Sequence, residues 1–219
     1  MNWITKFIKP KIASLFKKKT ADNGETLWTT CECKNLIYKE DLQNNLKTCP
    51  KCGAHHKLTC PERFEIFFDN KEFEILQTPI PKEDPINFFD NKSYKDRLKE
   101  AKKKTRQDDA VLIATGKVQN IDVTVGAQDF RFIGGSFGAA SGEAFIHGAQ
   151  HAITNRQPFI FFSCSGGQRM MESGIALMQM TRTVLAVNEL KKNKIPYIVV
   201  LTNPTTGGVT ASWAMLGDI

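Results

Sequence analysis

Residues 158–208 read PFIFFSCSGGQRMMESGIALMQMTRTVLAVNELKKNKIPYIVVLTNPTTGG, and this stretch determines the predicted topology. It holds two short apolar runs, PFIFFSCS and IPYIVVLTNPT, which are typical of buried strands. Between them, apolar residues recur at helical spacing as far as Lys192. Two strands joined through a helix form a right-handed crossover between parallel strands. We therefore predict an α/β fold with a parallel sheet.

Neighbouring regions add elements to this core. Residues 111–118 (VLIATGKV) and 121–128 (IDVTVGAQ) are rich in β-branched side chains and flank a two-residue turn, which predicts a β-hairpin. Residues 134–156 predict a loop followed by a helix. Residues 209–217 predict the beginning of another helix.

The composition divides the 219-residue chain into four predicted segments. The first is a basic arm with apolar residues near helical spacing, and the second is a short module rich in cysteine. The third is a charged connecting layer with a predicted helix from Tyr94 to Arg106, and the fourth is the α/β domain. In order, the segments are residues 1–26, 27–60, 61–108 and 109–219.

The net charge of +7 lies almost entirely in the arm, because residues 1–20 hold six lysines and no acidic residue. A basic groove across the main domain is therefore not predicted. No stretch approaches the ~20 apolar residues that span a bilayer, and we expect the protein in the cytoplasm. Six cysteines in such a chain indicate metal ligands in a reducing compartment rather than a disulfide framework.

Cys49 and Cys52, separated by two residues and followed by Gly53, are typical of a zinc knuckle. The expected partner pair, Cys31 and Cys33, has only one residue between its members, so both sulfurs can reach one ion only if the backbone kinks there. We predict one structural Zn²⁺ on these four cysteines, in a closed site that performs no catalysis. The alternatives are that His55, His56 or Cys60 replaces one of these ligands, or that the site is lost.

Three glycine pairs follow predicted strands or open predicted helices. Two of them, Gly166–Gly167 and Gly207–Gly208, follow buried strands, so their loops are expected side by side at one edge of the sheet. Backbone N–H groups in such loops can converge on one oxygen, which predicts an oxyanion hole. The third pair, Gly134–Gly135, begins the run that ends at Gly138.

Several common catalytic arrangements are absent from the sequence. No histidine lies at the end of a core strand, and Ser165 lacks the G-x-S-x-G context of a nucleophile elbow. We expect Cys164 to be an inert thiol, and His147 and His151 to lie on an ordinary helix face. The lack of a Walker loop and of a G-x-G-x-x-G turn argues against nucleotide hydrolysis and NAD chemistry.

The chain resembles the carboxyltransferase beta subunits of bacterial acetyl-CoA carboxylase, a family of the crotonase superfamily. The resemblance rests on seven motifs that cover most of the chain: LWT, NNLKTCPKCGAHH, KSYKDRLKEA, FIGGSFGAASGE, FSCSGGQRMMESG, ALMQM and PYIVVLTNPTTGGVTASWAMLGD. It implies a small zinc ribbon before a crotonase-like domain. It also implies an α₂β₂ assembly with the carboxyltransferase alpha subunit, acting with biotin carboxyl carrier protein and biotin carboxylase in fatty acid biosynthesis.

The reaction implied by this resemblance transfers a carboxyl group from carboxybiotin to acetyl-CoA and gives malonyl-CoA. Because the ureido anion of biotin can itself take the proton from the thioester methyl group, no protein base is required. The resemblance assigns the thioester oxyanion hole to Gly207–Gly208, with Gly166–Gly167 as the second donor. It places Gly134–Gly135 at the CoA-side wall, gives Arg169 the role of orienting its loop, and leaves the biotin half of the site to the alpha subunit.

Three features depart from the family pattern. The first cysteine pair is one residue short, Gln168 stands where alanine is usual, and the chain ends at Ile219 where the family continues. We therefore expect a truncated sequence whose crotonase-like domain is incomplete. Two other functions stay open: a nucleic-acid-binding protein that uses the arm and the ribbon, and a crotonase-type hydratase or isomerase with Glu143 or Glu172 facing the hole.

Overall fold

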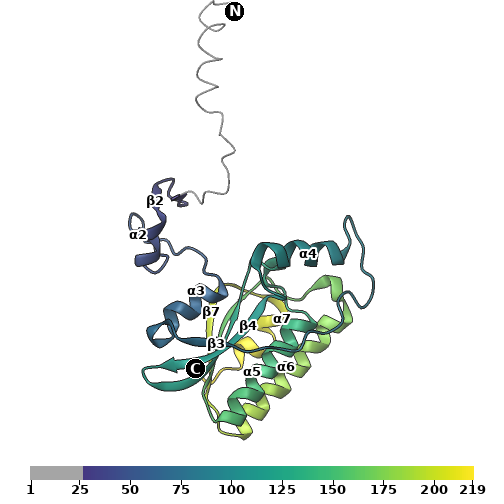
Figure 1. The fold of residues 1–219 in the computed structure, drawn as a ribbon. Helices are drawn as coiled ribbons and strands as arrows, with labels where there is room; N and C mark the ends of the chain where they lie inside the picture. Colours follow the sequence, from purple (N-terminus) through teal and green to yellow (C-terminus); the bar gives the residue numbers. More distant parts are fainter. Residues whose placement is uncertain (1–26) are drawn as a thin grey trace, which may run out of the picture. The chain divides into compact units, whose positions relative to one another are not determined.

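The computed structural model describes residues 27–219, so the predicted basic arm of residues 1–26 lies outside the described residues. The chain divides into two compact units after His56, slightly before the predicted end of the cysteine-rich module (Figure 1). Among residues 27–219, no helix combines the length and the apolar character that crossing a bilayer demands.

The first unit, within residues 27–56, is a two-stranded ribbon with one short helix. β1 (Trp28–Thr30) pairs antiparallel with β2 (Leu36–Tyr38), and α2 (Lys39–Asn44) follows directly. Its buried core consists of Ile37, Leu42 and two of the cysteines. A unit with so few apolar residues needs a cross-link such as a metal ion to stay folded.

The second unit, within residues 57–219, is built on a five-stranded sheet in the order β3–β4–β5–β6–β7. The strands are β3 (Phe73–Ile75), β4 (Val111–Val118), β5 (Ile121–Gln128), β6 (Phe159–Ser165) and β7 (Tyr197–Thr205). The predicted hairpin is confirmed, because β4 and β5 pair antiparallel around Gln119 and Asn120, which both have the positive φ of a type I′ turn. The predicted parallel pairing of β6 with β7 is also confirmed.

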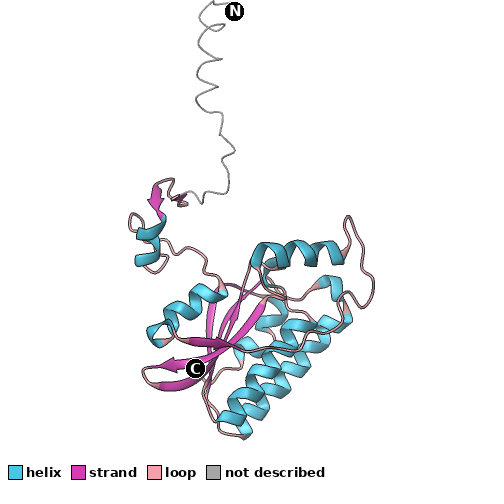
Figure 2. Cartoon of the chain, viewed as in Figure 1, coloured by secondary structure: helices cyan, strands magenta, loops and turns pink. Residues whose placement is uncertain are grey.

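Helices cover both faces of this sheet (Figure 2). They are α3 (Cys60–Phe67), α5 (Ala139–Asn155), α6 (Gly174–Lys192) and α7 (Gly207–Thr210). A further helix, α4 (Tyr94–Thr105), belongs to a separate apolar cluster that includes Phe132 and Met171. Along β6, Phe159 and Phe161 belong to the apolar cluster shared with α5 and α6, whereas Ile160 and Phe162 belong to the cluster shared with α3. Because both faces of β6 are covered, its sequence is apolar at every position from Phe159 to Phe162.

Two segments differ from the sequence prediction. The predicted connecting layer supplies part of the core, because Phe64 and Phe68 are buried against the sheet and β3 pairs with β4. The helix predicted over residues 209–217 is only the single turn α7, followed by a 3₁₀ turn at Trp213–Met215. Ser212 separates the two turns because its backbone, at φ −126° and ψ −117°, is not helical. The helix predicted from Tyr94 is confirmed as α4.

Candidate functional site

The parallel strands β5, β6 and β7 end at the same edge of the sheet, and a glycine pair follows each of them. The loops after β5 and β6 are joined by three backbone hydrogen bonds: Gly166 N–H to Gly134 O (2.9 Å), Phe137 N–H to Gly167 O (2.8 Å) and Arg169 N–H to Phe137 O (2.9 Å). The two loops therefore behave as one continuous wall.

The loop after β7 lies directly against the loop after β6. Thr206 donates to Ser165 O through both its N–H (3.0 Å) and its Oγ1 (3.2 Å). A Cβ built on Gly207 would lie only 3.2 Å from Gly167 Cα, so a side chain at this point would force the loops apart. Gly207 and Gly167 also have positive φ values, 62° and 120°, which favour glycine. The expectation that these loops lie side by side agrees with the structure.

The amide groups of the adjoining loops differ in what they already bind. Gly166 N–H donates to a backbone carbonyl of the preceding loop, and Gly167 N–H donates to Ser165 Oγ at 3.0 Å. Within residues 27–219, the N–H groups of Gly207 and Gly208 donate to no other group, and Gly207 is exposed. The expectation of a second donor at Gly166–Gly167 therefore needs correction, because hydrogen bonds inside the protein already use both amides. Of the four glycine amides in these two loops, those of Gly207 and Gly208 are the open ones within residues 27–219.

The Gly134–Gly135 pair lies in the loop after β5, where that loop packs against the end of β6. Gly135 has a positive φ of 60°, and a Cβ there would overlap the carbonyl of Cys164. Gln128, the last residue of β5, holds the pair in place by donating from Nε2 to Gly135 O at 2.6 Å. Around Gly134, a Cβ would meet nothing within 4 Å, so this side of the loop is open.

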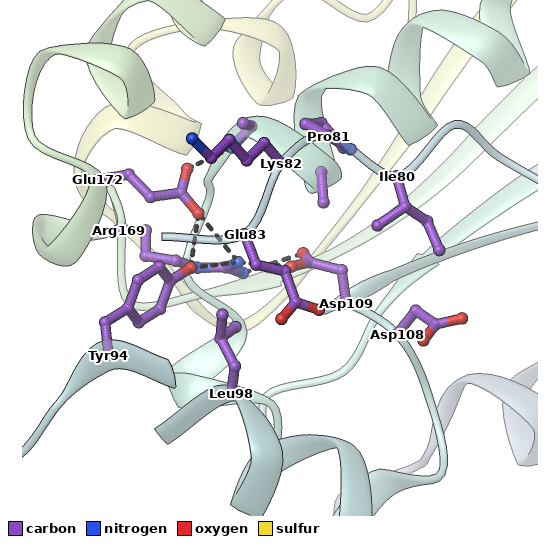
Figure 3. Close-up of a pocket in the computed structure, with 12 residues that line it drawn as sticks. Ile80, Pro81, Lys82, Glu83, Tyr94, Leu98, Asp108, Asp109, Arg169 and Glu172 are labelled. Carbon is purple, nitrogen blue, oxygen red and sulfur yellow. Dashed lines mark hydrogen bonds and ion pairs between the residues drawn. The ribbon is translucent and has the colours of Figure 1, made fainter. Parts of the chain in front are cut away.

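Behind the loops, Arg169 is the centre of a buried polar network (Figure 3). Its guanidinium makes a bidentate pair with Asp109, with Nη1–Oδ2 at 2.5 Å and Nη2–Oδ1 at 2.9 Å. It also donates to the Oγ (3.0 Å) and the backbone oxygen (2.6 Å) of Ser136. Glu172 completes the network at 3.5 Å from Nη1 and accepts from Tyr94 OH at 2.6 Å. Arg169 thus holds the loop after β6 against α4 and the loop after β5, in agreement with the orienting role expected for it.

Two groups of this network keep one protonation state near neutral pH: Tyr94 stays neutral and Arg169 stays charged. Burial raises the pKa of the Tyr94 phenol, and this outweighs the opposing effect of Arg169. Burial alone would lower the pKa of Arg169, but the Asp109 carboxylate raises it above its usual value. The adjacent cavity has a volume of about 20 Å³, which suits an ordered water and is far too small for a substrate. The network therefore acts as internal support.

Other groups capable of acid–base chemistry are engaged elsewhere. Glu143 pairs with Arg182, and Glu172 accepts from Tyr94 OH and from the backbone of α5. His151 Nδ1 lies 3.0 Å from a threonine hydroxyl on β5. Since neither glutamate is free to face the glycine loops, the hydratase or isomerase alternative loses the groups it requires.

The four cysteines of the first unit bring their sulfur atoms together. All four Sγ atoms lie within 4.8 Å of one another, with Cys31–Cys52 at 3.6 Å and Cys33–Cys49 at 4.0 Å. Zinc–sulfur bonds of about 2.3 Å in a tetrahedron place sulfurs about 3.8 Å apart, so this set fits one zinc ion. The short pair reaches the site because the chain turns after β1, where Lys34 N–H donates to Cys31 O at 2.9 Å. This turn is the kink that the spacing requires.

Two of the alternative zinc ligands have other partners. His55 Nδ1 lies 3.2 Å from Thr48 Oγ1, and Cys60 Sγ donates to Ala127 O at 3.2 Å in the second unit. The four-cysteine set leaves no open coordination position, so its role is to hold the ribbon together.

Comparison with known proteins identifies the family. Residues 82–218 match the carboxyl transferase domain, and residues 28–52 match the acetyl-CoA carboxylase zinc finger domain. The acetyl-coenzyme A carboxylase carboxyl transferase subunit beta of Pelagibacter ubique is 52% identical over 223 residues, which cover 100% of this chain and 72% of that protein. The chain belongs to this beta subunit family. The Chelativorans sp. subunit is 46% identical over 220 residues, covering 100% of this chain and 71% of its own.

Solved structures with low sequence identity share the fold of this beta subunit. The transcarboxylase 12S hexamer has a TM-score of 0.60 at 22% identity, covering 83% of this chain and 30% of that one. A Pseudomonas malonate decarboxylase hetero-tetramer has a TM-score of 0.53 at 21% identity, covering 70% and 54%. The expected carboxyltransferase class, with its zinc ribbon and crotonase-like fold, is therefore confirmed.

Sequence reasoning missed several residues that support the glycine loops. Asp109 and Tyr94 reach Arg169 from 60 and 75 residues away, and no local motif predicts such a pairing. Thr206 and Ser165 are visible only as neighbours of glycine pairs. A polar residue directly beside each pair was the one signal in the sequence that could have indicated them.

Proposed function

We propose that this beta subunit binds acetyl-CoA and promotes transfer of a carboxyl group to it from carboxybiotin, which is carried on the biotin carboxyl carrier protein. The product is malonyl-CoA. The observation that carries the proposal is the pair of open amides at Gly207 and Gly208, which have no partner within the described residues. They lie where two glycine loops adjoin, and the contact between Gly207 and Gly167 involves backbone atoms alone.

The chain's own contribution is stabilisation of negative charge. As a proton leaves the methyl group of acetyl-CoA, charge moves onto the thioester oxygen, and the Gly207 and Gly208 amides are arranged to donate to it. One well-placed donor of this kind contributes about 2.7–4 kcal/mol to the transition state. When bound, carboxybiotin would supply CO₂ by cleavage of its N–carboxyl bond, and the ureido nitrogen freed by that cleavage would take the proton. This division of labour agrees with the engagement of Glu143 and Glu172 in ion pairs and hydrogen bonds elsewhere.

Gly166–Gly167 forms the facing wall of the same site, and Gly134–Gly135 forms the wall nearest the CoA moiety. Phe130 lies 4.0 Å from the Cβ position of Gly166, and Lys57 Nζ lies 4.0 Å from the centre of the Phe130 ring. A lysine at this rim suits the phosphate groups of CoA, because an ammonium group pairs well with phosphate oxygens.

The proposed working form is an α₂β₂ assembly in the cytoplasm, in which the carboxyltransferase alpha subunit completes the biotin half of the site. Biotin carboxylase supplies the carboxylated carrier. The zinc ribbon is structural in this scheme, because its four sulfurs leave no position for a substrate.

The test is to coexpress the chain with an alpha subunit and to measure malonyl-CoA formation from acetyl-CoA and carboxybiotin. We expect activity that requires both subunits and biotin, and acetyl-CoA binding by calorimetry. Absence of acetyl-CoA binding by the folded assembly would contradict the proposal. RNA binding that weakens steeply with salt, with no affinity for CoA thioesters, would favour the nucleic-acid alternative instead.

A further inference from the structure

Gln168 lies at the junction of the glycine loops and α6. Its backbone forms a parallel bridge with Phe137 in the loop after β5. In the orientation favoured by its neighbours, its side-chain amide donates to Phe137 O at 2.8 Å and to Ala176 O at 3.2 Å. The side chain is therefore tied to the loop after β5 and to the first turn of α6.

The same side chain fills the space beside Gly208. A Cβ built on Gly208 would lie 2.5 Å from the terminal amide of Gln168 and 2.6 Å from its Cγ. The close approach involves the middle of the side chain as well as its tip, so Gln168 would have to leave its position to admit even one methyl group. The carbonyl of Gly208 is also held, because Ser212 Oγ donates to Gly208 O at 2.6 Å. Gly208 thus contacts Gln168 at its Cα and Ser212 at its carbonyl oxygen.

We propose that Gln168 is a positioning residue for the Gly208 amide, an inference that rests on the function proposed above. Gly208 has no side chain to pack, and α7 is a single turn, so groups packed against the turn set the direction of its N–H. Gln168 links α7 to the loops after β5 and β6, and thereby sets the distance between the Gly208 amide and these two loops. Misplacement of a catalytic group by about 1 Å can lower a rate about 10²-fold.

Gly208→Ala tests this geometry because it keeps the amide hydrogen. The φ of Gly208 is not in the positive range, so alanine suits the backbone, and the obstacle is Gln168. Gly174→Ala is the matched control, because a Cβ on Gly174 would meet nothing within 4 Å and its φ is also not positive. The experiment compares Gly208→Ala, Gln168→Ala and the double variant in the assembled carboxyltransferase, with kcat, KM for acetyl-CoA and Tm measured for each.

We expect Gly208→Ala to lower kcat by about 10- to 100-fold, with KM changed less than about threefold. In the Gln168→Ala background the same substitution should lower kcat by less than about threefold, because the obstructing side chain is gone. Gly174→Ala should match wild type. Equal fold-losses in both backgrounds would refute the inference, as would kcat losses that simply follow losses in Tm.

Gln168→Met separates packing from hydrogen bonding, since methionine keeps the length of the side chain and removes both donors. We expect the kcat of Gln168→Met to lie below wild type and to equal that of Gln168→Ala, because both variants lack the donors; wild-type kcat would overturn the tie to Phe137 O and Ala176 O. An inactive wild-type assembly would refute the proposed function itself. An active wild type with additive losses would refute only the role of Gln168.

Discussion

Proline at position 208 should abolish one hydrogen-bond donor while leaving the fold intact. Gly208 is the second residue of α7, a position where a proline removes no hydrogen bond within the described residues. Gly207 has no Cβ to clash with the following ring. The ring would still meet Gln168, so the comparison is made in the Gln168→Ala background, between Gly208→Pro and Gly208→Ala. These two variants differ chiefly in the presence of the N–H.

The expected magnitude follows from the number of open donors. With two unpartnered amides at the site, losing one should cost about 2.7–4 kcal/mol of transition-state stabilisation, which is about 10²- to 10³-fold in kcat. The assay is steady-state malonyl-CoA formation by the assembled carboxyltransferase, with Tm confirming that both variants fold. If the proline and alanine variants have kcat values within about threefold of each other and equal Tm, the donor role of Gly208 is refuted. Proline at Gly207 is a poorer probe, because its φ of 62° is inaccessible to proline.

Three further predictions concern the rest of the chain. Cys49→Ser should reduce bound zinc, measured by elemental analysis, from one equivalent to a small fraction, while the unfolding of residues 57–219 keeps its midpoint because the two units are separate. Asp109→Asn should lower the free energy of unfolding of the second unit by about 3–5 kcal/mol, measured in urea, because it leaves Arg169 buried without its partner. The control is Asp90→Asn, which removes one partner of an exposed ion pair with Arg97 and should change the free energy of unfolding little. Asp69→Asn should weaken the dependence of the free energy of unfolding on pH in the acid range. Backbone amides of the β4–β5 turn lower the pKa of this carboxyl below 3.8, so its stabilisation is present above that pH and is lost as the pH falls through the lower, folded-state value; an unchanged acid limb would contradict this.

The hairpin and the crossovers could be predicted because their signals are local. The β-branched residues and the two-residue turn in residues 111–128 indicate a hairpin, and the apolar run in residues 158–165 indicates a buried strand, without reference to distant parts of the chain. β3 and α3 could not be predicted in the same way, because Phe64 and Phe73 stand in a charged segment; Phe64 is buried, and Phe73 partly buried, only in the completed fold. Tertiary burial, not propensity, determines their state.

The site shows the same division between local and long-range information. Glycine pairs after strands indicate where backbone approaches backbone, and Gly167 and Gly207 do so. Which amides remain open is a different matter, because Ser165 Oγ takes the Gly167 N–H through a side-chain rotamer that no motif specifies. The pairing of Arg169 with Asp109, 60 residues apart, likewise depends on the completed fold.

Two adjacent residues, Gln168 and Arg169, explain how a site made of glycine can be rigid. Glycine loops lose much conformational entropy on ordering and have no side chains with which to anchor themselves. Arg169 points inward and fixes the loop to Asp109 through two charge-assisted hydrogen bonds, while Gln168 packs against Gly208 in the facing loop. Donors stabilise a developing charge most effectively when they need not reorganise as the reaction proceeds. Side chains behind the loops therefore supply the rigidity, and the absence of side chains at Gly167 and Gly207 lets the two backbones pack directly against each other.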